Sequence, residues 1–151
     1  MKKKKTSYII NLCRLSLVRE RSTTVYAPIR EPGDVAALHR RLMGPSPACE
    51  HVLLLALDSR HKVLVAIEVA RGGANSAHIP RSTCLRAALC ANASALIIVH
   101  NHPSGLVDVS PEDCEMTRAL KAADELVDLQ LLDSVVVTTD EYASLREQGA
   151  M

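Results

Sequence analysis

The segment ALIIVHNHPSGLVDVSPED, residues 95–113, holds the features that decide both the fold and the chemistry expected of this 151-residue chain. It opens with an apolar run that is too short for a helix and well suited to a central, buried strand. His100 and His102 stand where this strand should end, directly before a Pro-Ser-Gly turn. Because residues two apart in extended backbone point to the same side, the two imidazoles should project together, and imidazole nitrogens are good zinc ligands.

The second half of the segment predicts the start of a helix that carries a carboxylate. Ser110 is suited to the N-cap, Pro111 to the first helical position and Asp113 to the third. Two histidines and one aspartate would leave a fourth tetrahedral position for a water, which is typical of catalytic zinc and would bring the pKa of that water towards about 7. Each piece also has a purely structural explanation, since S-x-x-D approximates a capping box. It is their combination that favours a metal site.

The flanking sequence predicts an α/β fold with one mixed sheet flanked by helices. The runs HVLLLALD and KVLVAIEVA are expected to form a hairpin of buried strands, and residues 135–138 a further strand. Asp34 is expected to cap a first helix that ends at Gly44, a short helix should follow Pro80, and the longest helix should begin at Pro111. Residues 9–18 resemble an irregular leading strand. The predicted organisation is therefore a tail and leading strand over residues 1–30, followed by one domain over residues 31–151.

Composition excludes several classes of protein. The formal net charge of +1 gives no general attraction to polyanions, and the lysine run at residues 2–5 is better explained as a frayed tail than as a nucleic-acid arm. No apolar stretch approaches the roughly 20 residues of a membrane helix, and polar residues interrupt any signal peptide, so a cytoplasmic location is expected. The five cysteines include no CxxC pair, which predicts small buried hydrophobes in a reducing compartment rather than disulfides.

The spacing H-x-H, seven residues, then S-x-x-D resembles the JAMM (MPN) metalloprotease-like family, and it is carried by His100, His102, Ser110 and Asp113. The fuller string HNHPSG, with SPED and Thr117 downstream, is similar to the RadC branch of that family. The likeness extends from about residue 50 to residue 149 and includes Gly72, Gly73, Asn75, Ser76, Pro80, Arg81 and the LLD at residues 131–133.

The resemblance implies a cytidine-deaminase-like α-β-α architecture and one zinc ion per chain. His100, His102 and Asp113 would be the ligands, and Ser110 would donate a hydrogen bond to the developing oxyanion. A glutamate from an earlier strand would be the general base, and Glu50 matches that position. Glu68, on the neighbouring strand, is the alternative base.

Two positions depart from the family pattern. Ser82 follows Arg81 where the family usually has glutamate, and Ser134 replaces the histidine that usually follows LLD. Both lie outside the implied ligand set, so they bear on substrate binding or on the tuning of the site. The remaining histidines are expected to be structural: His39 on the polar side of the first helix, His61 in the hairpin turn, and His51 and His78 at the surface or hydrogen-bonded.

These observations predict a zinc-dependent hydrolase that cleaves a peptide or isopeptide bond through a zinc-activated water. The alternatives are a DNA-repair-associated factor that binds DNA or a repair partner, and a non-catalytic interaction module. Near-neutral charge and the absence of an aromatic stacking platform argue against DNA binding, and the complete ligand set argues against the module. A peptide or protein substrate is the expected partner, a membrane is not, and the sequence does not specify an oligomeric state.

Overall fold

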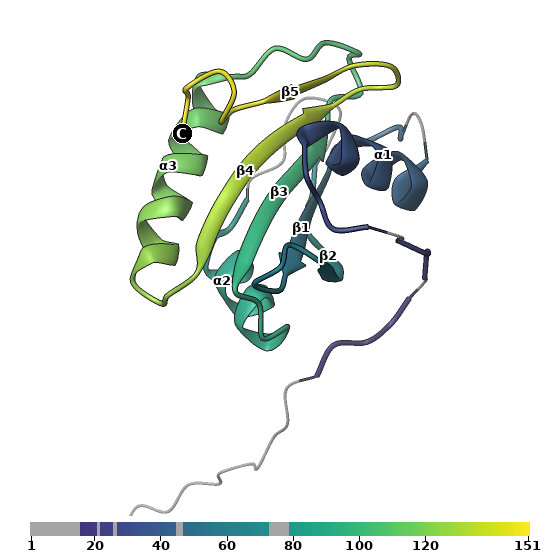
Figure 1. Ribbon diagram of the computed structural model, residues 1–151. Helices are drawn as coiled ribbons and strands as arrows, with labels where there is room; N and C mark the ends of the chain where they lie inside the picture. Colours follow the sequence, from purple (N-terminus) through teal and green to yellow (C-terminus); the bar gives the residue numbers. More distant parts are fainter. Residues whose placement is uncertain (1–15, 21, 26, 45–46, 73–78) are drawn as a thin grey trace, which may run out of the picture.

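A five-stranded sheet runs through the part of the chain that the computed structural model describes, which is residues 16–20, 22–25, 27–44, 47–72 and 79–151 (Figure 1). Its strands are β1 (His51–Leu57), β2 (Val63–Arg71), β3 (Ala95–Asn101), β4 (Gln130–Val137) and β5 (Tyr142–Ser144). Its helices are α1 (Pro32–Met43), α2 (Arg81–Cys90) and α3 (Pro111–Glu125).

The strands lie in the order β2-β1-β3-β4-β5, and only β3 and β4 are parallel. Parallel neighbours need a long crossover, and α3 lies in the connection between these two. β1 and β2 form the predicted hairpin, and α2 and α3 begin next to Pro80 and at Pro111 as expected. The prediction of a mixed sheet flanked by helices is confirmed.

Helices cover both faces of the sheet, which gives three layers (Figure 1). On one face, Leu53 and Leu55 of β1 pack with Val35 and Leu38 of α1. On the other face, a second cluster joins β1 and β3 to α2 and α3, and it contains Val52, Leu54, Cys84, Ala88, Leu96, Ile98 and Leu120. Every residue of β1 and β3 is buried, as expected of strands covered on both sides. Aliphatic side chains therefore form the core without any Phe or Trp.

Helix α1 begins differently from its prediction. Its N-cap is Glu31, and Asp34 is the third helical residue, where its carboxylate accepts the backbone N–H groups of Arg30 and Glu31 at 2.9 and 3.3 Å. Asp34 is thus the third helical residue of a capping box, where it bonds the backbone N–H of the N-cap, and is not the N-cap itself. The helix ends at Met43, and Gly44 follows with φ 89°, a conformation suited to glycine.

The C-terminal sheet is longer than the sequence indicates. β4 begins at Gln130, five residues before the predicted start, and the three-residue strand β5 was not predicted because it is too short to show a pattern. Residues 9–15 of the expected leading strand, the lysine run and residues 73–78 lie outside the described residues, and residues 16–18 have no regular structure. The domain boundary at residue 31 stays a prediction.

The prediction that most cysteines are buried is wrong for the four that are described. Only Cys84 is buried, while Cys49 and Cys114 are half-buried and Cys90 is exposed, all as free thiols.

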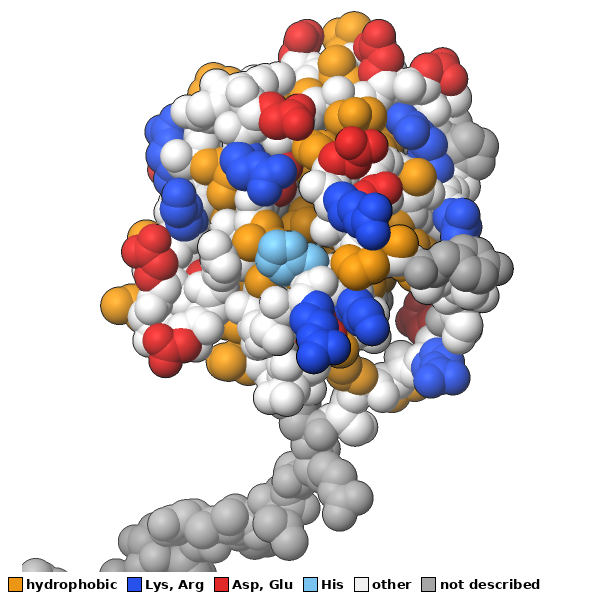
Figure 2. All heavy atoms as spheres, in the orientation of Figure 1, with side chains coloured by type: hydrophobic (Ala, Val, Ile, Leu, Met, Phe, Trp, Pro, Cys, Tyr) orange, Lys and Arg blue, Asp and Glu red, His pale blue; other side chains and the backbone are white. Residues whose placement is uncertain are grey.

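The described surface carries both signs of charge. Figure 2 shows Lys and Arg side chains interspersed with Asp and Glu on the face that it displays, without a continuous basic stripe. Among the described residues, none of the helices has the length and apolar character that crossing a membrane requires.

Candidate metal centre

The end of β3 fixes two histidines side by side. His100 is the last but one residue of the strand and is fully buried, and His102 follows just beyond it. The backbone N–H of His102 donates to the carbonyl of Val137 on β4 at 3.1 Å, so the chain stays extended through both residues. Alternation along the strand then directs both rings to the same side of the sheet.

The ring nitrogens of the two histidines meet at the separation that a shared metal ion needs. His100 Nε2 lies 3.2 Å from His102 Nε2 and 3.3 Å from Oδ1 of Asp113. Two ligands of a tetrahedral zinc ion, each about 2.0–2.1 Å from it, lie about 3.3 Å apart. His100 thus lies at that spacing from each of the other two predicted ligands, His102 and Asp113.

The proton positions also suit a cation. His102 Nδ1 lies 3.0 Å from the carbonyl oxygen of Leu106. Because a carbonyl only accepts, Nδ1 carries the proton and Nε2 keeps its lone pair in the neutral ring. A lone pair on His102 and a charged oxygen on Asp113 both face His100 Nε2, so a proton on that atom, or a cation in its place, must lie between them.

Asp113 is positioned by the start of α3. Ser110 is the N-cap, as predicted: its hydroxyl accepts the N–H of Asp113 at 3.1 Å and donates to Asp113 Oδ2 at 2.6 Å. The N–H of Ser110 donates to the same oxygen at 3.0 Å. Oδ2 is thereby occupied by the cap and Oδ1 is left for His100. In this conformation the Ser110 proton serves Asp113.

Asp113 keeps its negative charge although it is partly buried. Burial alone would raise the pKa of this carboxyl group. The hydrogen bond and charge of His100, together with the hydroxyl and N–H of Ser110, outweigh burial and hold the pKa of Asp113 well below its usual range. An ionised carboxylate is the form that binds a metal ion.

Glu50 joins the cluster from the residue before β1. One of its carboxylate oxygens and one ring nitrogen from each of His100 and His102 lie within 4.8 Å of one another, which makes these three a potential metal-binding group. Glu50 is 7% exposed. Glu68, the alternative base, lies elsewhere: its carboxylate binds His51 and Arg71. The geometry therefore brings Glu50, and not Glu68, to the two histidines.

One nearby residue, Asn101, was not identified from the sequence. Asn101, between the two histidines, accepts the N–H of His51 at 2.9 Å and donates to the carbonyl of Cys49 at 3.0 Å. These bonds tie down the main chain on both sides of Glu50. A polar residue between two metal ligands at a strand end is the only signal that the sequence offered.

The prediction for His39 is wrong. It is 1% exposed rather than on the polar side of α1, and neither ring nitrogen has a hydrogen-bond partner among the described residues. Burial, followed by the charges of His100, His51 and Arg40, lowers its pKa to about 4. Together with His102 it lines a cavity of about 20 Å³, which has room for one water.

The structure also places the remaining histidines and the two residues that depart from the family pattern, Ser82 and Ser134. His51 is buried and hydrogen-bonded, as one of its two predicted alternatives stated, and His61 is exposed in the hairpin turn. His78 lies outside the described residues. Ser82 is exposed in the first turn of α2, while Ser134 is fully buried on β4 with no partner for its hydroxyl among the described residues. Of these two residues, only Ser134 lies in the protein interior, where a difference from the family pattern can affect packing.

Comparison with known proteins agrees with this geometry. The family model described as RadC-like JAB domain matches residues 29–150. Similar proteins include a UPF0758 protein of Chloroflexus aggregans, 43% identical over 122 residues, which are 81% of this chain and 53% of that protein. A UPF0758 protein of Marinobacter nauticus is 40% identical over 124 residues, which are 82% of this chain and 55% of that protein. The chain spans about half the length of the curated relatives that it matches. From its matched residues and its identity with these relatives, the chain belongs to the RadC-like JAB domain family.

Proposed function

We propose that this chain is a zinc-dependent hydrolase that cleaves a peptide or isopeptide bond, with His100, His102 and Asp113 as ligands and Glu50 as general base. The observation that carries the proposal is the pair of separations from His100 Nε2, 3.2 Å to His102 and 3.3 Å to Asp113. Three ligands of this kind leave one position of a tetrahedral ion open, which is the arrangement of catalytic rather than structural zinc.

In this proposal three residues hold the metal ion, and Glu50 transfers the proton. When bound, zinc would supply Lewis acidity towards a substrate carbonyl and a water. Glu50, buried beside the two histidines, takes a proton from the attacking water and gives it to the leaving amine. The carbonyl of Leu106 keeps the lone pair of His102 directed into the site.

Ser110 has two duties that differ in their consequences. Its hydroxyl donates to Asp113 Oδ2 at 2.6 Å, which supports a role in positioning that ligand. The predicted donation to an oxyanion requires the hydroxyl to turn away from Asp113. We propose the positioning role first and keep the oxyanion role as a prediction; the value of kcat at saturating zinc separates the two.

The free thiols of the described cysteines support a reducing, cytoplasmic setting. The substrate class rests on the chemistry of the site and on the family resemblance, since the name UPF0758 specifies no activity. A DNA-binding role draws no support from the interspersed charges in Figure 2.

Two measurements test the proposal in order. Purified protein should bind one zinc ion per chain by elemental analysis and by calorimetry of the metal-free form. The zinc-loaded protein should then be assayed on a panel of peptides and of peptides joined through a lysine side chain. A protein that binds no stoichiometric divalent ion overturns the metal site, whatever the assay shows.

The base is tested with a matched pair of variants. Glu50→Gln should keep zinc and lose at least about 100-fold in kcat on any substrate that responds, because the amide cannot take a proton. Glu115→Gln, an exposed glutamate one position beyond Cys114 on α3, should keep both zinc and rate. Unchanged hydrolysis in Glu50→Gln would contradict the assignment of the base while leaving the metal site intact.

A further inference from the structure

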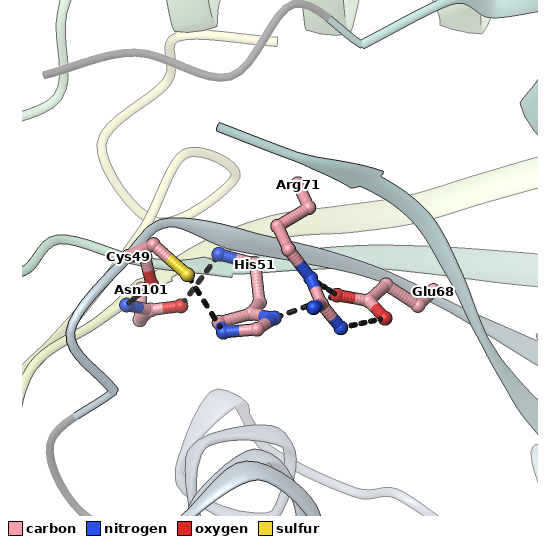
Figure 3. A network of polar contacts seen from close by, with 5 residues as sticks. All are labelled: Cys49, His51, Glu68, Arg71 and Asn101. Atoms are coloured by element: carbon pink, nitrogen blue, oxygen red, sulfur yellow. Dashed lines mark hydrogen bonds and ion pairs between the residues drawn. The ribbon is translucent and has the colours of Figure 1, made fainter. Parts of the chain in front are cut away.

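A second cluster of reactive side chains lies at the same end of the sheet as the metal centre. His51 Nδ1 lies 2.6 Å from Glu68 Oε1, and the other ring nitrogen, Nε2, lies 3.3 Å from the thiol sulfur of Cys49 (Figure 3). The three groups form a line with the imidazole in the middle. A metal site would have its ligands converge on one point, whereas a line through both nitrogens of one ring suits the transfer of a proton.

This cluster faces away from the metal centre. His51 alternates with Val52 and shares its side of β1 with Leu53, which packs in the α1 cluster. Leu53 pairs with Glu68 across the hairpin, so Glu68 is on that side as well. His100 lies on the opposite side with Ile98 and contacts Asp113 of α3. The two clusters therefore use opposite faces of the same strands.

Arg71 fixes the charge and the direction of Glu68. Its guanidinium donates two hydrogen bonds to the carboxylate, at 3.0 Å to Oε1 and 2.9 Å to Oε2. These bonds, followed by the hydrogen bond of His51, hold the pKa of Glu68 below its usual range despite partial burial. An ionised carboxylate can only accept, so His51 Nδ1 carries the ring proton. The lone pair of Nε2 is then directed at the thiol of Cys49.

The surroundings of Cys49 differ from those of the other described thiols. Its sulfur is half-buried, and the guanidinium of Arg71 is close enough for the two charges to interact. Burial and the charge of Asp124 raise the pKa of the Cys84 thiol to about 12. Among the described residues, no base is hydrogen-bonded to the thiol of Cys90 or Cys114. A partly exposed thiol beside a base and a cation has the features of reactive cysteines.

We propose that Cys49 is a nucleophilic thiol, that His51 is its base and Glu68 the group that orients the base, and that its reactants are low-molecular-weight disulfides. The thiol proton passes to His51 Nε2 as the sulfur of Cys49 bonds to one sulfur of the disulfide. The disulfide bond of the reactant breaks, and its other sulfur leaves with the electron pair and takes the proton from His51. Cys49 is oxidised to a mixed disulfide, and the released half of the reactant is reduced to a thiol.

The proposal is tested with hydroxyethyl disulfide, an uncharged reagent, on the full-length chain at pH 7. Adduct formation at each cysteine is followed by mass spectrometry of quenched, digested samples, and exposed Cys90 serves as the internal reference. We expect Cys49 to react at least about tenfold faster than Cys90, because the neighbouring imidazole can take the thiol proton as the sulfur attacks. The readout needs neither bound metal nor hydrolysis, so it is independent of the proposed function.

Three variants test whether the reaction rate of Cys49 depends on His51 and Glu68. His51→Gln should bring the rate of Cys49 down to that of Cys90, and Glu68→Gln should lower it by about three- to tenfold, since the base remains but is less firmly oriented. His61→Gln, at the exposed hairpin turn, is the matched control and should leave the rate unchanged.

Two results would overturn the proposal: a parent protein in which Cys49 reacts no faster than Cys90, or an excess rate that persists in the variants. Circular dichroism and a thermal melt report whether each variant is folded. If His51→Gln does not fold, the comparison of the parent protein with Glu68→Gln decides the question. A rate in Glu68→Gln equal to that of the parent then counts against the cluster.

Discussion

The two faces of the sheet treat their polar groups differently although they are built from alternate residues of the same two short segments. On the α3 face, Glu50, His100 and His102 direct their ligand atoms to one region. On the α1 face, Cys49 and His51 belong to a line of paired donors and acceptors that ends at Arg71. The ligand atoms of the first group converge on one region. The second group forms a chain of polar contacts that runs from Cys49 through His51 and Glu68 to Arg71.

This difference shows how strand alternation separates two chemistries at one sheet edge. Neighbouring residues in extended backbone point to opposite sides, so a single residue step separates a group of the proposed metal site from a group of the proposed proton-transfer cluster. The two faces can then be perturbed one at a time.

The largest effect is expected in the packed layers on which both clusters rest. Leu54 faces α2 and α3, Leu55 faces α1, and both are fully buried. Leu54→Ala and Leu55→Ala should each lower the free energy of unfolding by about 2–5 kcal/mol, because each leaves a cavity. Urea denaturation measures both. A loss below about 1 kcal/mol for one of them would mean that its face is loosely packed, and would break the symmetry of the comparison.

Replacing one carboxylate on each face should weaken zinc binding only when the carboxylate lies on the α3 face. Asp113→Asn removes a charged ligand and should weaken zinc binding by about 100-fold or more. Glu68→Gln, on the α1 face, should change zinc affinity by less than about twofold. Competition with a chelating dye measures both. Equal losses would indicate that the two clusters are coupled through the strands.

The buried groups without partners should give the two sides opposite responses to pH. Burial, followed by the charges of His100, His51 and Arg40, lowers the pKa of His39 from 6.5 to about 4. Burial raises the pKa of Asp124, on α3, from 3.8 to about 6. Between pH 4 and 6 the unfolded chain binds more protons than the folded chain at His39 and fewer at Asp124. Stability contributed at His39 therefore rises with pH, while that at Asp124 falls.

Variants should expose these opposing slopes. Relative to the parent protein, Asp124→Asn should gain stability as the pH rises from 4 to 6, and at pH 7 it should be more stable by on the order of 2 kcal/mol. His39→Leu should show the reverse change of slope over the same range. Denaturation of the metal-free protein at pH 4, 5, 6 and 7 gives the slopes. Three parallel curves would remove this distinction between the two sides.

The smallest effect concerns the two helix starts, which are alike in stability and differ in function. Ser110→Ala and Asp34→Ala should each cost about 1 kcal/mol, because each loses hydrogen bonds at a helix N-terminus. Only Ser110→Ala should also weaken zinc binding, by about tenfold, because Ser110 positions a ligand. If kcat is restored when zinc is saturating, positioning is its whole role. A persistent loss of kcat would support the oxyanion role.

The sequence predicted those parts of the fold and site that depend on local pattern. The buried hairpin, the central strand and the cap at Ser110 each follow from a run of residues and from the turn or capping residues that bound it. The short strand β5 and the early start of β4 depend on pairing with distant strands, which no local pattern records. The approach of His102 and Asp113 to His100 could be anticipated because a short loop joins these residues.

The parts that escaped prediction required knowledge of packing. His39 has a polar side chain on an amphipathic helix, and its burial against the sheet is decided by tertiary contacts. The family resemblance favoured Glu50 over Glu68, but the residues alone left both open, because the answer depends on which face each occupies at the hairpin, where the register shifts between Val52 and Leu53. For the same reason, the line from Cys49 to Glu68 was visible only in three dimensions.

The side-chain amide of Asn101 has a consequence for how the triplet HNH is understood. With one acceptor and one donor, it reproduces the hydrogen-bonding capacity of a peptide unit and adds one more rung to the ladder between β1 and β3. Aspartate would set an acceptor against the carbonyl of Cys49, and leucine would leave both main-chain groups without this partner. The middle letter of the triplet is thus prescribed by the neighbouring main chain. The three consecutive letters thus answer to two demands: the first and third to the proposed metal site, and the second to the main chain.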